Sequence, residues 1–179
     1  MFVQTEITPN PNSLKFLPGK IVSNQGSYEI TKKDDINNEL VKNLLSINGI
    51  EGIFLGRDFI SVNKYENISW DEVKHIVISL INDFYSSGKE CVIEKDLNEE
   101  NDNLKEIEKK IVKILEEKIR PAVSKDGGDI KFKEFKDGIV KVQLQGSCSG
   151  CPSSKMTLKQ GVQNLLCHYL PEVKEVIAD

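Results

Sequence analysis

The sequence of 179 residues lacks the features of a membrane-spanning, secreted or disulfide-stabilised protein. No apolar run approaches the roughly 20 residues that a membrane span requires. The first twelve residues contain no basic patch and no long apolar stretch, so they have neither mark of an export or import signal. Only four cysteines are present, and a chain of this length can bury a core without a disulfide framework. We therefore expect a protein of a reducing compartment, either the cytosol or the destination of a chain already processed.

A strong charge of one sign is also lacking, since the net charge is −4. Residues 1–103 carry 10 basic and 17 acidic side chains, and residues 104–179 carry 14 and 11. A weakly acidic half beside a weakly basic one, without a cationic stripe that includes aromatics, argues against nucleic-acid binding. The sequence contains no phosphate-binding loop, no paired carboxylates and no nucleophile–base arrangement. We therefore predict that the chain is not an enzyme.

A polar, acidic stretch at 94–103, EKDLNEENDN, divides the chain. It contains a single apolar residue, so it cannot bury enough surface to order itself. We predict an N-terminal domain at 1–92, a linker at 93–103 and a C-terminal domain at 104–179.

In the N-terminal domain, strand and helix patterns alternate. Leu14 and Phe16 have strand spacing between turn-forming residues, and the spacing around Leu40 is helical. Two further strands, GIEGIFLG and DFISVNK, meet at a tight turn. Ser69 and Glu72 have the spacing of a capping box and begin a second, longer amphipathic helix. These patterns predict a small α+β domain.

The C-terminal domain opens with a long amphipathic helix that Pro121 must kink or restart, because proline removes a backbone donor. The run KDGGD at 125–129 predicts a turn, and two strands joined at Asp137–Gly138 predict a hairpin. A second helix begins near Pro152, and a short strand follows Pro171. The predicted fold class is therefore α+β for both domains. In the C-terminal one, two long helices pack on a short three-stranded sheet.

One pair of cysteines has a spacing with chemical meaning. Cys148 lies in the loop that leaves the second hairpin strand, and Cys151 immediately precedes Pro152. Proline is favoured at the first helical position, which puts Cys151 at the N-cap. Free amides and the positive end of the helix there stabilise a thiolate, the form that ligates metal. Lys155 on the next turn is a further positive group, although a solvated lysine is the simpler interpretation.

A [4Fe-4S] cluster or a closed zinc site needs four ligands, and this chain offers one usable pair. Cys167 lies 16 residues beyond Cys151, which is roughly 24 Å along a helix. Cys91 belongs to the other domain. The simplest completion is a second chain that contributes the same two sulfurs across a two-fold axis. Two ligands per chain in an exposed loop hold a cluster loosely, which suits delivery better than permanent electron transfer.

Two rival interpretations use the same cysteines. A dithiol/disulfide oxidoreductase also places CxxC at a helix N-terminus, but in a βαβ context rather than after a hairpin. A dimeric zinc protein fits equally well with the ligand chemistry, because thiolates bind both metals.

The stretches IRPAVSKDGGDIKF and VQLQGSCSGCPSSKMTLKQGVQNLL resemble the C-terminal NifU-like (Nfu) domain of iron–sulfur scaffold and carrier proteins. TPNPNSLKFLPG and GIEGIFLGRDFISV resemble the N-terminal domain of the mitochondrial and related bacterial members. The resemblance implies a [4Fe-4S] cluster on Cys148 and Cys151 that bridges two subunits. It also implies delivery to apo enzymes, including those of lipoate synthesis and respiration, and upstream assembly proteins as donors. The expected location is the bacterial cytoplasm, or the mitochondrial matrix for a processed eukaryotic form.

For the other residues that attract notice, the simplest role is structural. Cys91 and Cys167 are predicted to be buried small hydrophobes. His75 and His168 are expected at the surface or in the core rather than on a metal. Trp70 is predicted to anchor the core. Asp126 and Asp129 flank two glycines and are predicted to be turn and capping residues.

Overall fold

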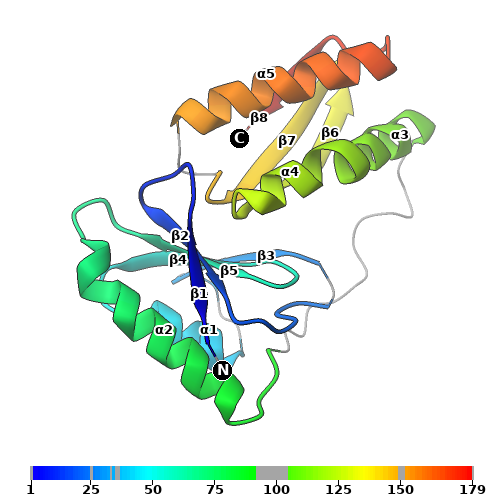
Figure 1. The fold of residues 1–179 in the computed structure, drawn as a ribbon. Helices are drawn as coiled ribbons and strands as arrows, with labels where there is room; N and C mark the ends of the chain where they lie inside the picture. Colours follow the sequence, from blue (N-terminus) through cyan, green and yellow to red (C-terminus); the bar gives the residue numbers. More distant parts are fainter. Residues whose placement is uncertain are drawn as a thin grey trace. The chain divides into compact units, whose positions relative to one another are not determined.

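The chain forms two compact units, Met1–Glu94 and Lys95–Asp179 (Figure 1). The computed structural model describes residues 2–24, 26–32, 34, 37–91, 105–148 and 152–178, with the backbone alone at 152–155. The predicted linker at 93–103 lies outside the described residues. Both units combine helices with a sheet, so the predicted α+β class is confirmed.

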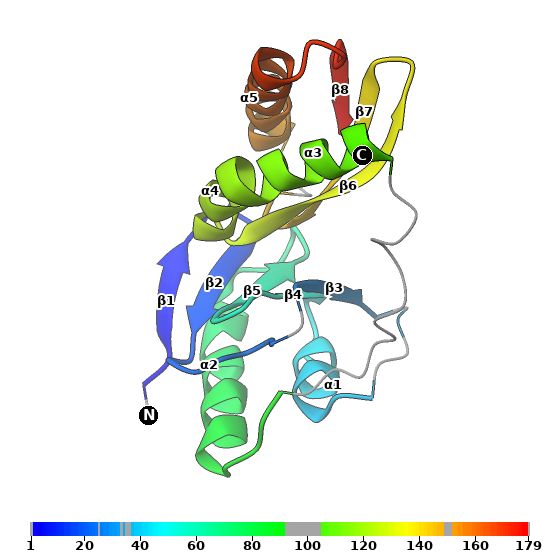
Figure 2. The same ribbon diagram turned by 90° about the vertical axis from the view of Figure 1, so that its right-hand side faces the viewer.

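Unit 1 is built on a five-stranded sheet with the order β1-β2-β5-β4-β3, in which all paired neighbours are antiparallel. Its strands are β1 (Gln4–Ile7), β2 (Ser13–Leu17), β3 (Tyr28–Thr31), β4 (Ile50–Leu55) and β5 (Ile60–Lys64). Two helices, α1 (Glu39–Leu45) and α2 (Trp70–Ser86), lie on one face of this sheet (Figure 2). The predicted strands around Phe16 and on either side of Gly56 are therefore confirmed.

Helix α2 is amphipathic because its apolar residues recur at helical spacing. The buried ones are Val73, Val77, Ile81, Phe84 and Tyr85. The Ser69 hydroxyl caps the helix, but it accepts its hydrogen bond from Asp71 N–H at 3.3 Å, not from Glu72 as a capping box would require. Glu72 N–H donates instead to the Ser69 carbonyl oxygen. Ser69 therefore caps α2 through a bond one residue nearer than predicted.

Trp70 packs against the core of unit 1 but is only half-buried. Its ring lies 6.3 Å from that of Phe16, and its Nε1–H donates to the Pro11 carbonyl oxygen at 3.0 Å. The indole therefore fastens the turn before β2 to the start of α2, as well as packing on the core.

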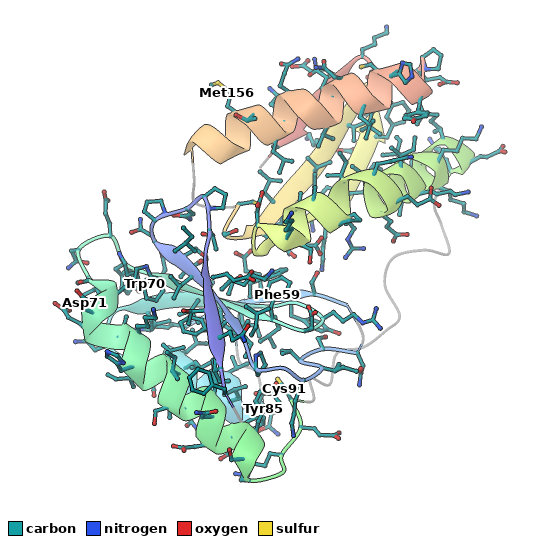
Figure 3. All side chains as sticks on the ribbon, in the orientation of Figure 1. Phe59, Trp70, Asp71, Tyr85, Cys91 and Met156 are labelled. Atoms are coloured by element: carbon teal, nitrogen blue, oxygen red, sulfur yellow. The ribbon has the colours of Figure 1, made fainter. Side chains whose placement is uncertain are left out.

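Tyr85, near the end of α2, carries a buried hydroxyl that has no hydrogen-bond partner among the described residues. Figure 3 shows it next to Cys91. Burial, and secondarily the Cys91 thiol, raises the pKa of Tyr85 far above its usual value, so the phenol stays protonated. A buried, unsatisfied hydroxyl is destabilising.

We expect Tyr85→Phe to stabilise unit 1 by about 1 kcal/mol, because the substitution removes the unpaired hydroxyl and keeps the ring. Thermal unfolding measures the change as a higher Tm. Tyr169→Phe, at a half-exposed tyrosine in unit 2, serves as the control and should leave Tm unchanged. A lower Tm for Tyr85→Phe would show that the hydroxyl has a partner in solution.

Unit 2 has a three-stranded sheet with the order β6-β7-β8. The hairpin of β6 (Gly128–Lys136) and β7 (Ile139–Gly146) turns at Asp137 and Gly138, which have φ values of 52° and 80°. The last strand, β8 (Glu175–Ala178), runs parallel to β7. Helix α5 (Pro152–Tyr169) and the helical stretch at 106–125 pack on one face of the sheet. The predicted helices and three-stranded sheet are confirmed, but β7, α5 and β8 also form a parallel βαβ unit, so the expectation that the CxxC pair lies outside such a context is wrong.

The helical stretch before β6 is interrupted, as Pro121 predicts. It comprises α3 (Glu106–Ile114), a π-helical turn η1 (Leu115–Ile119) and α4 (Arg120–Lys125). Pro121 lies at the start of α4, where its missing N–H removes one donor of the regular helix. The wider turn therefore precedes the proline and brings Arg120 to the beginning of β6.

Across the part of the chain that the structure describes, no helix is long and apolar enough to cross a membrane.

Candidate metal centre

Cys148 follows β7 after a sharp change of backbone direction at Gly146, whose φ is 67°. Helix α5 begins at Pro152, as predicted, so Cys151 directly precedes the first helical residue in the sequence. Cys151, with Ser149 and Gly150, lies outside the described residues. The ligand assignment of Cys148 and Cys151 therefore stays a prediction.

The side chain of Cys148 is buried, with 6% of its residue surface exposed, and belongs to the core of unit 2. The expectation that the first cysteine lies in an exposed loop is therefore wrong. The sulfur faces the start of β6, where Gly128 lacks a side chain. A Cβ atom placed on Gly128 would lie 2.7 Å from both the Cys148 sulfur and the Gln145 carbonyl oxygen. The absent side chain makes room for the sulfur.

The segment before Cys148 is bonded to the residues that precede β6. The Ser147 hydroxyl donates to the Asp126 carbonyl oxygen, and Ser147 N–H donates to the Gly127 carbonyl oxygen at 3.3 Å. Gly127 has a φ of 83°, as the predicted glycine turn requires, while Gly128 already pairs with Gly146 in the sheet. The residues 126–129, here called the 126–129 segment, thus form the support on which Cys148 lies.

Asp129 is a buried carboxylate, and the prediction of a simple turn or capping residue is wrong. Arg120 Nε donates to its Oδ1 at 2.9 Å and Arg120 Nη2 donates to its Oδ2 at 2.8 Å, which makes a bidentate pair. Ile130 N–H donates to Oδ1 at 2.8 Å. The hydrogen bond to Asp129 raises the pKa of Arg120. No local pattern connects Arg120 with Asp129, because the helix and strand that carry them meet only in the tertiary fold.

The two remaining cysteines do not join Cys148. Cys167 donates its thiol hydrogen to the Val173 carbonyl oxygen at 3.2 Å and links α5 to the residues before β8. Cys91 accepts a hydrogen bond from Asn38 Nδ2 at 3.5 Å, and burial raises the pKa of its thiol. Both pack against the core of their own unit, as predicted, but each is half-buried rather than buried.

Both histidines are exposed on their helices, which confirms a surface position. Among the described residues, no group of three or more His, Cys, Asp or Glu side chains could hold a metal ion. Lys155 lies where only the backbone is described, so its contribution to a metal site stays a prediction.

A hairpin and a helix that begins at proline, with a CxxC motif in the sequence between them, define unit 2 as a small α+β module with a candidate thiolate site. Residues 111–177 match the NifU-like domain model, and residues 3–88 match the model described as scaffold protein Nfu/NifU N terminal. The chain belongs to the NifU-like (Nfu) family.

Similar proteins include NifU-like protein 4, mitochondrial, of Arabidopsis thaliana, at 43% identity over 98% of this chain and 65% of that protein. NFU1 iron-sulfur cluster scaffold homolog, mitochondrial, of Homo sapiens is also 43% identical, over 98% of this chain and 71% of that protein. The chain thus spans about two thirds of the length of such curated relatives. Among solved structures, a NifU-like protein from Saccharomyces cerevisiae aligns with 52% of this chain and 85% of its own, at 29% identity and a TM-score of 0.46.

Proposed function

We propose that this protein is an iron–sulfur cluster scaffold and carrier. Cys148 and Cys151 of two subunits would together bind one [4Fe-4S] cluster and pass it to apo proteins. The observation that carries the proposal is the cysteine pair directly before α5 in a chain of the NifU-like family. The name printed for the human relative, an iron-sulfur cluster scaffold homolog, supports the same role.

The beginning of α5 suits a thiolate. The helix has 18 residues, and its positive end stabilises negative charge on groups within the first turn. Cys151 precedes this turn in the sequence, so its sulfur can be held as the deprotonated ligand that iron requires. An all-thiolate cluster is anionic, and the same helix end would offset part of its charge.

A cluster bound between two subunits requires the Cys148 sulfur to be reachable from outside its own unit. The sulfur is packed against Gly128, within the core of unit 2. A cluster shared with a second chain must contact this sulfur through the small part of Cys148 that is exposed, 6% of its residue surface. This requirement suits a carrier that binds its cargo reversibly better than it suits a permanent redox centre.

Four thiolates are needed and each chain supplies two, so the cluster-bound form would be a homodimer. Its partners would be apo iron–sulfur enzymes and the assembly proteins that load it. We propose a binding and transfer role without catalysis, in the bacterial cytoplasm or, for a processed eukaryotic form, in the mitochondrial matrix. The relatives described above are named as mitochondrial proteins.

Anaerobic reconstitution with iron and sulfide tests the proposal. We expect a brown protein with about one [4Fe-4S] cluster per two chains, twice the apo mass in light scattering, and activation of an apo [4Fe-4S] enzyme. Protein that takes up no iron but reduces disulfides catalytically would favour the dithiol oxidoreductase. One tightly held zinc ion per two chains that iron and sulfide do not replace would favour the dimeric zinc protein.

A further inference from the structure

Cys148 lies so close to Gly128 that any side chain at position 128 would overlap with it. A Cβ on Gly128 would be 2.7 Å from the Cys148 sulfur and 3.2 Å from the Cys148 Cβ. It would also be 2.7 Å from the Gln145 carbonyl oxygen, which is backbone and cannot rotate away. Packed interiors have little room to absorb such an overlap. The place of the sulfur therefore depends on the missing side chain.

The 126–129 segment is itself held in place by Arg120, which binds the side chain of Asp129. Arg120 holds Asp129 through two nearly equal hydrogen bonds, and the Asp129 side chain is only 6% exposed. Two parallel bonds to a planar guanidinium fix the orientation of the carboxylate, which a single contact would not. The outer partner of Arg120, Glu116, is more than half-exposed and 3.5 Å from Nη1, so it contributes less.

These contacts form a continuous chain from the helix at 106–125 to the candidate ligand. Arg120 holds Asp129, the adjacent Gly128 contacts the sulfur, and Ser147 is bonded to Asp126 and Gly127. We infer that Gly128, together with the Arg120–Asp129 pair, positions the Cys148 sulfur for cluster binding. This inference rests on the proposed function and names residues outside the CxxC motif as positioning residues.

The test compares Gly128→Ala with Gly161→Ala. Gly161 lies on α5, where an added Cβ would have no other atom within 4 Å, and neither glycine has a positive φ, so only the change at Gly128 meets a steric overlap. In the apo protein, alkylation by iodoacetamide at one fixed pH is followed at each cysteine by peptide mass spectrometry. We expect Gly128→Ala to raise the rate at Cys148 relative to Cys167, because the added methyl displaces the sulfur from its packed position.

In the reconstituted protein, we expect Gly128→Ala to release its cluster to a chelator about tenfold faster, which corresponds to about 1.4 kcal/mol. Gly161→Ala should match the wild type in both measurements. Cys167 belongs to the same unit, so a merely structural effect of Gly128→Ala would raise the alkylation rates of Cys148 and Cys167 together. That outcome would overturn the inference.

Arg120→Lys provides a second variant should Gly128→Ala fail to fold. It keeps the charge but loses the bidentate geometry, and we expect the same changes with smaller size. Glu116→Gln, which removes only the exposed partner of Arg120, is its control. If Gly128→Ala and Arg120→Lys both keep the wild-type alkylation ratio and release rate, the inference is wrong and the carrier function stands. If the wild type takes up no cluster, the carrier function fails, while the alkylation ratio still reports whether these residues position Cys148.

Discussion

We expect the double variant Cys148→Ser, Cys151→Ser to be colourless after anaerobic reconstitution. Its iron content should be below about a tenth of that of the wild type. A serine hydroxyl is a far poorer ligand for iron than a thiolate, because it stays protonated at neutral pH. The two changes together would remove all four proposed ligands of the dimer. Iron and sulfide analysis measures the loss, and light scattering should show that the treated protein no longer gains mass.

Cys91→Ser and Cys167→Ser are the matched controls for this experiment. Both thiols already bond within their own units, Cys91 with Asn38 and Cys167 with the Val173 carbonyl oxygen. We expect each single variant to bind a cluster as the wild type does. Loss of the cluster in either one, or its retention in the double variant, would show that the ligands have been assigned to the wrong residues.

The second large effect concerns the core of unit 1. Two isoleucines on α2 differ in burial, since Ile81 is 0% exposed and Ile76 is 47% exposed. We expect Ile81→Ala to lower the free energy of unfolding of unit 1 by about 2–5 kcal/mol, through lost apolar contacts and the cavity left behind. Ile76→Ala should stay within about 0.5 kcal/mol of the wild type.

Thermal unfolding followed by circular dichroism measures both changes, and cysteine alkylation assigns them to a unit. Cys91 packs against the core of unit 1 and Cys167 against that of unit 2. Ile81→Ala should therefore raise the alkylation rate of Cys91 and leave that of Cys167 unchanged. Equal destabilisation by Ile76→Ala would contradict this orientation of α2.

Local patterns in the sequence predict most of the fold. Asp137–Gly138 fixes the hairpin of unit 2 because both residues adopt positive φ, and the periodicity of α2 identifies its buried face. The strands β1 and β3 escape prediction, since each has only four residues and lies at an edge of the sheet, which is too short for a strand pattern to be recognised. The parallel direction of β8 also escapes prediction, although a long helix between two strands is the usual connection of a parallel pair.

At the candidate site, the sequence predicts the loop of Cys148 and the start of α5, because glycine and proline act through the local backbone. It does not predict that Cys148 is buried. Gly128 has the pattern of a turn glycine, but it lies in β6 and is needed for space beside the sulfur. Its role depends on a residue 20 positions later in the sequence, and such a contact exists only once β6 and β7 have paired.

The π-helical turn before Arg120 lets one helical stretch both pack on the core of unit 2 and bind Asp129. A regular α-helix turns about 100° per residue. The angle about the helix axis between its apolar face and any later residue is therefore fixed by the number of residues between them. Ile111 and Leu115 face the core of unit 2 before or at this turn, whereas Arg120 must reach Asp129 after it. The wide turn adjusts the helical phase between these two requirements. Hydrophobic anchoring and orientation of the carboxylate are thereby satisfied along a single continuous stretch of backbone.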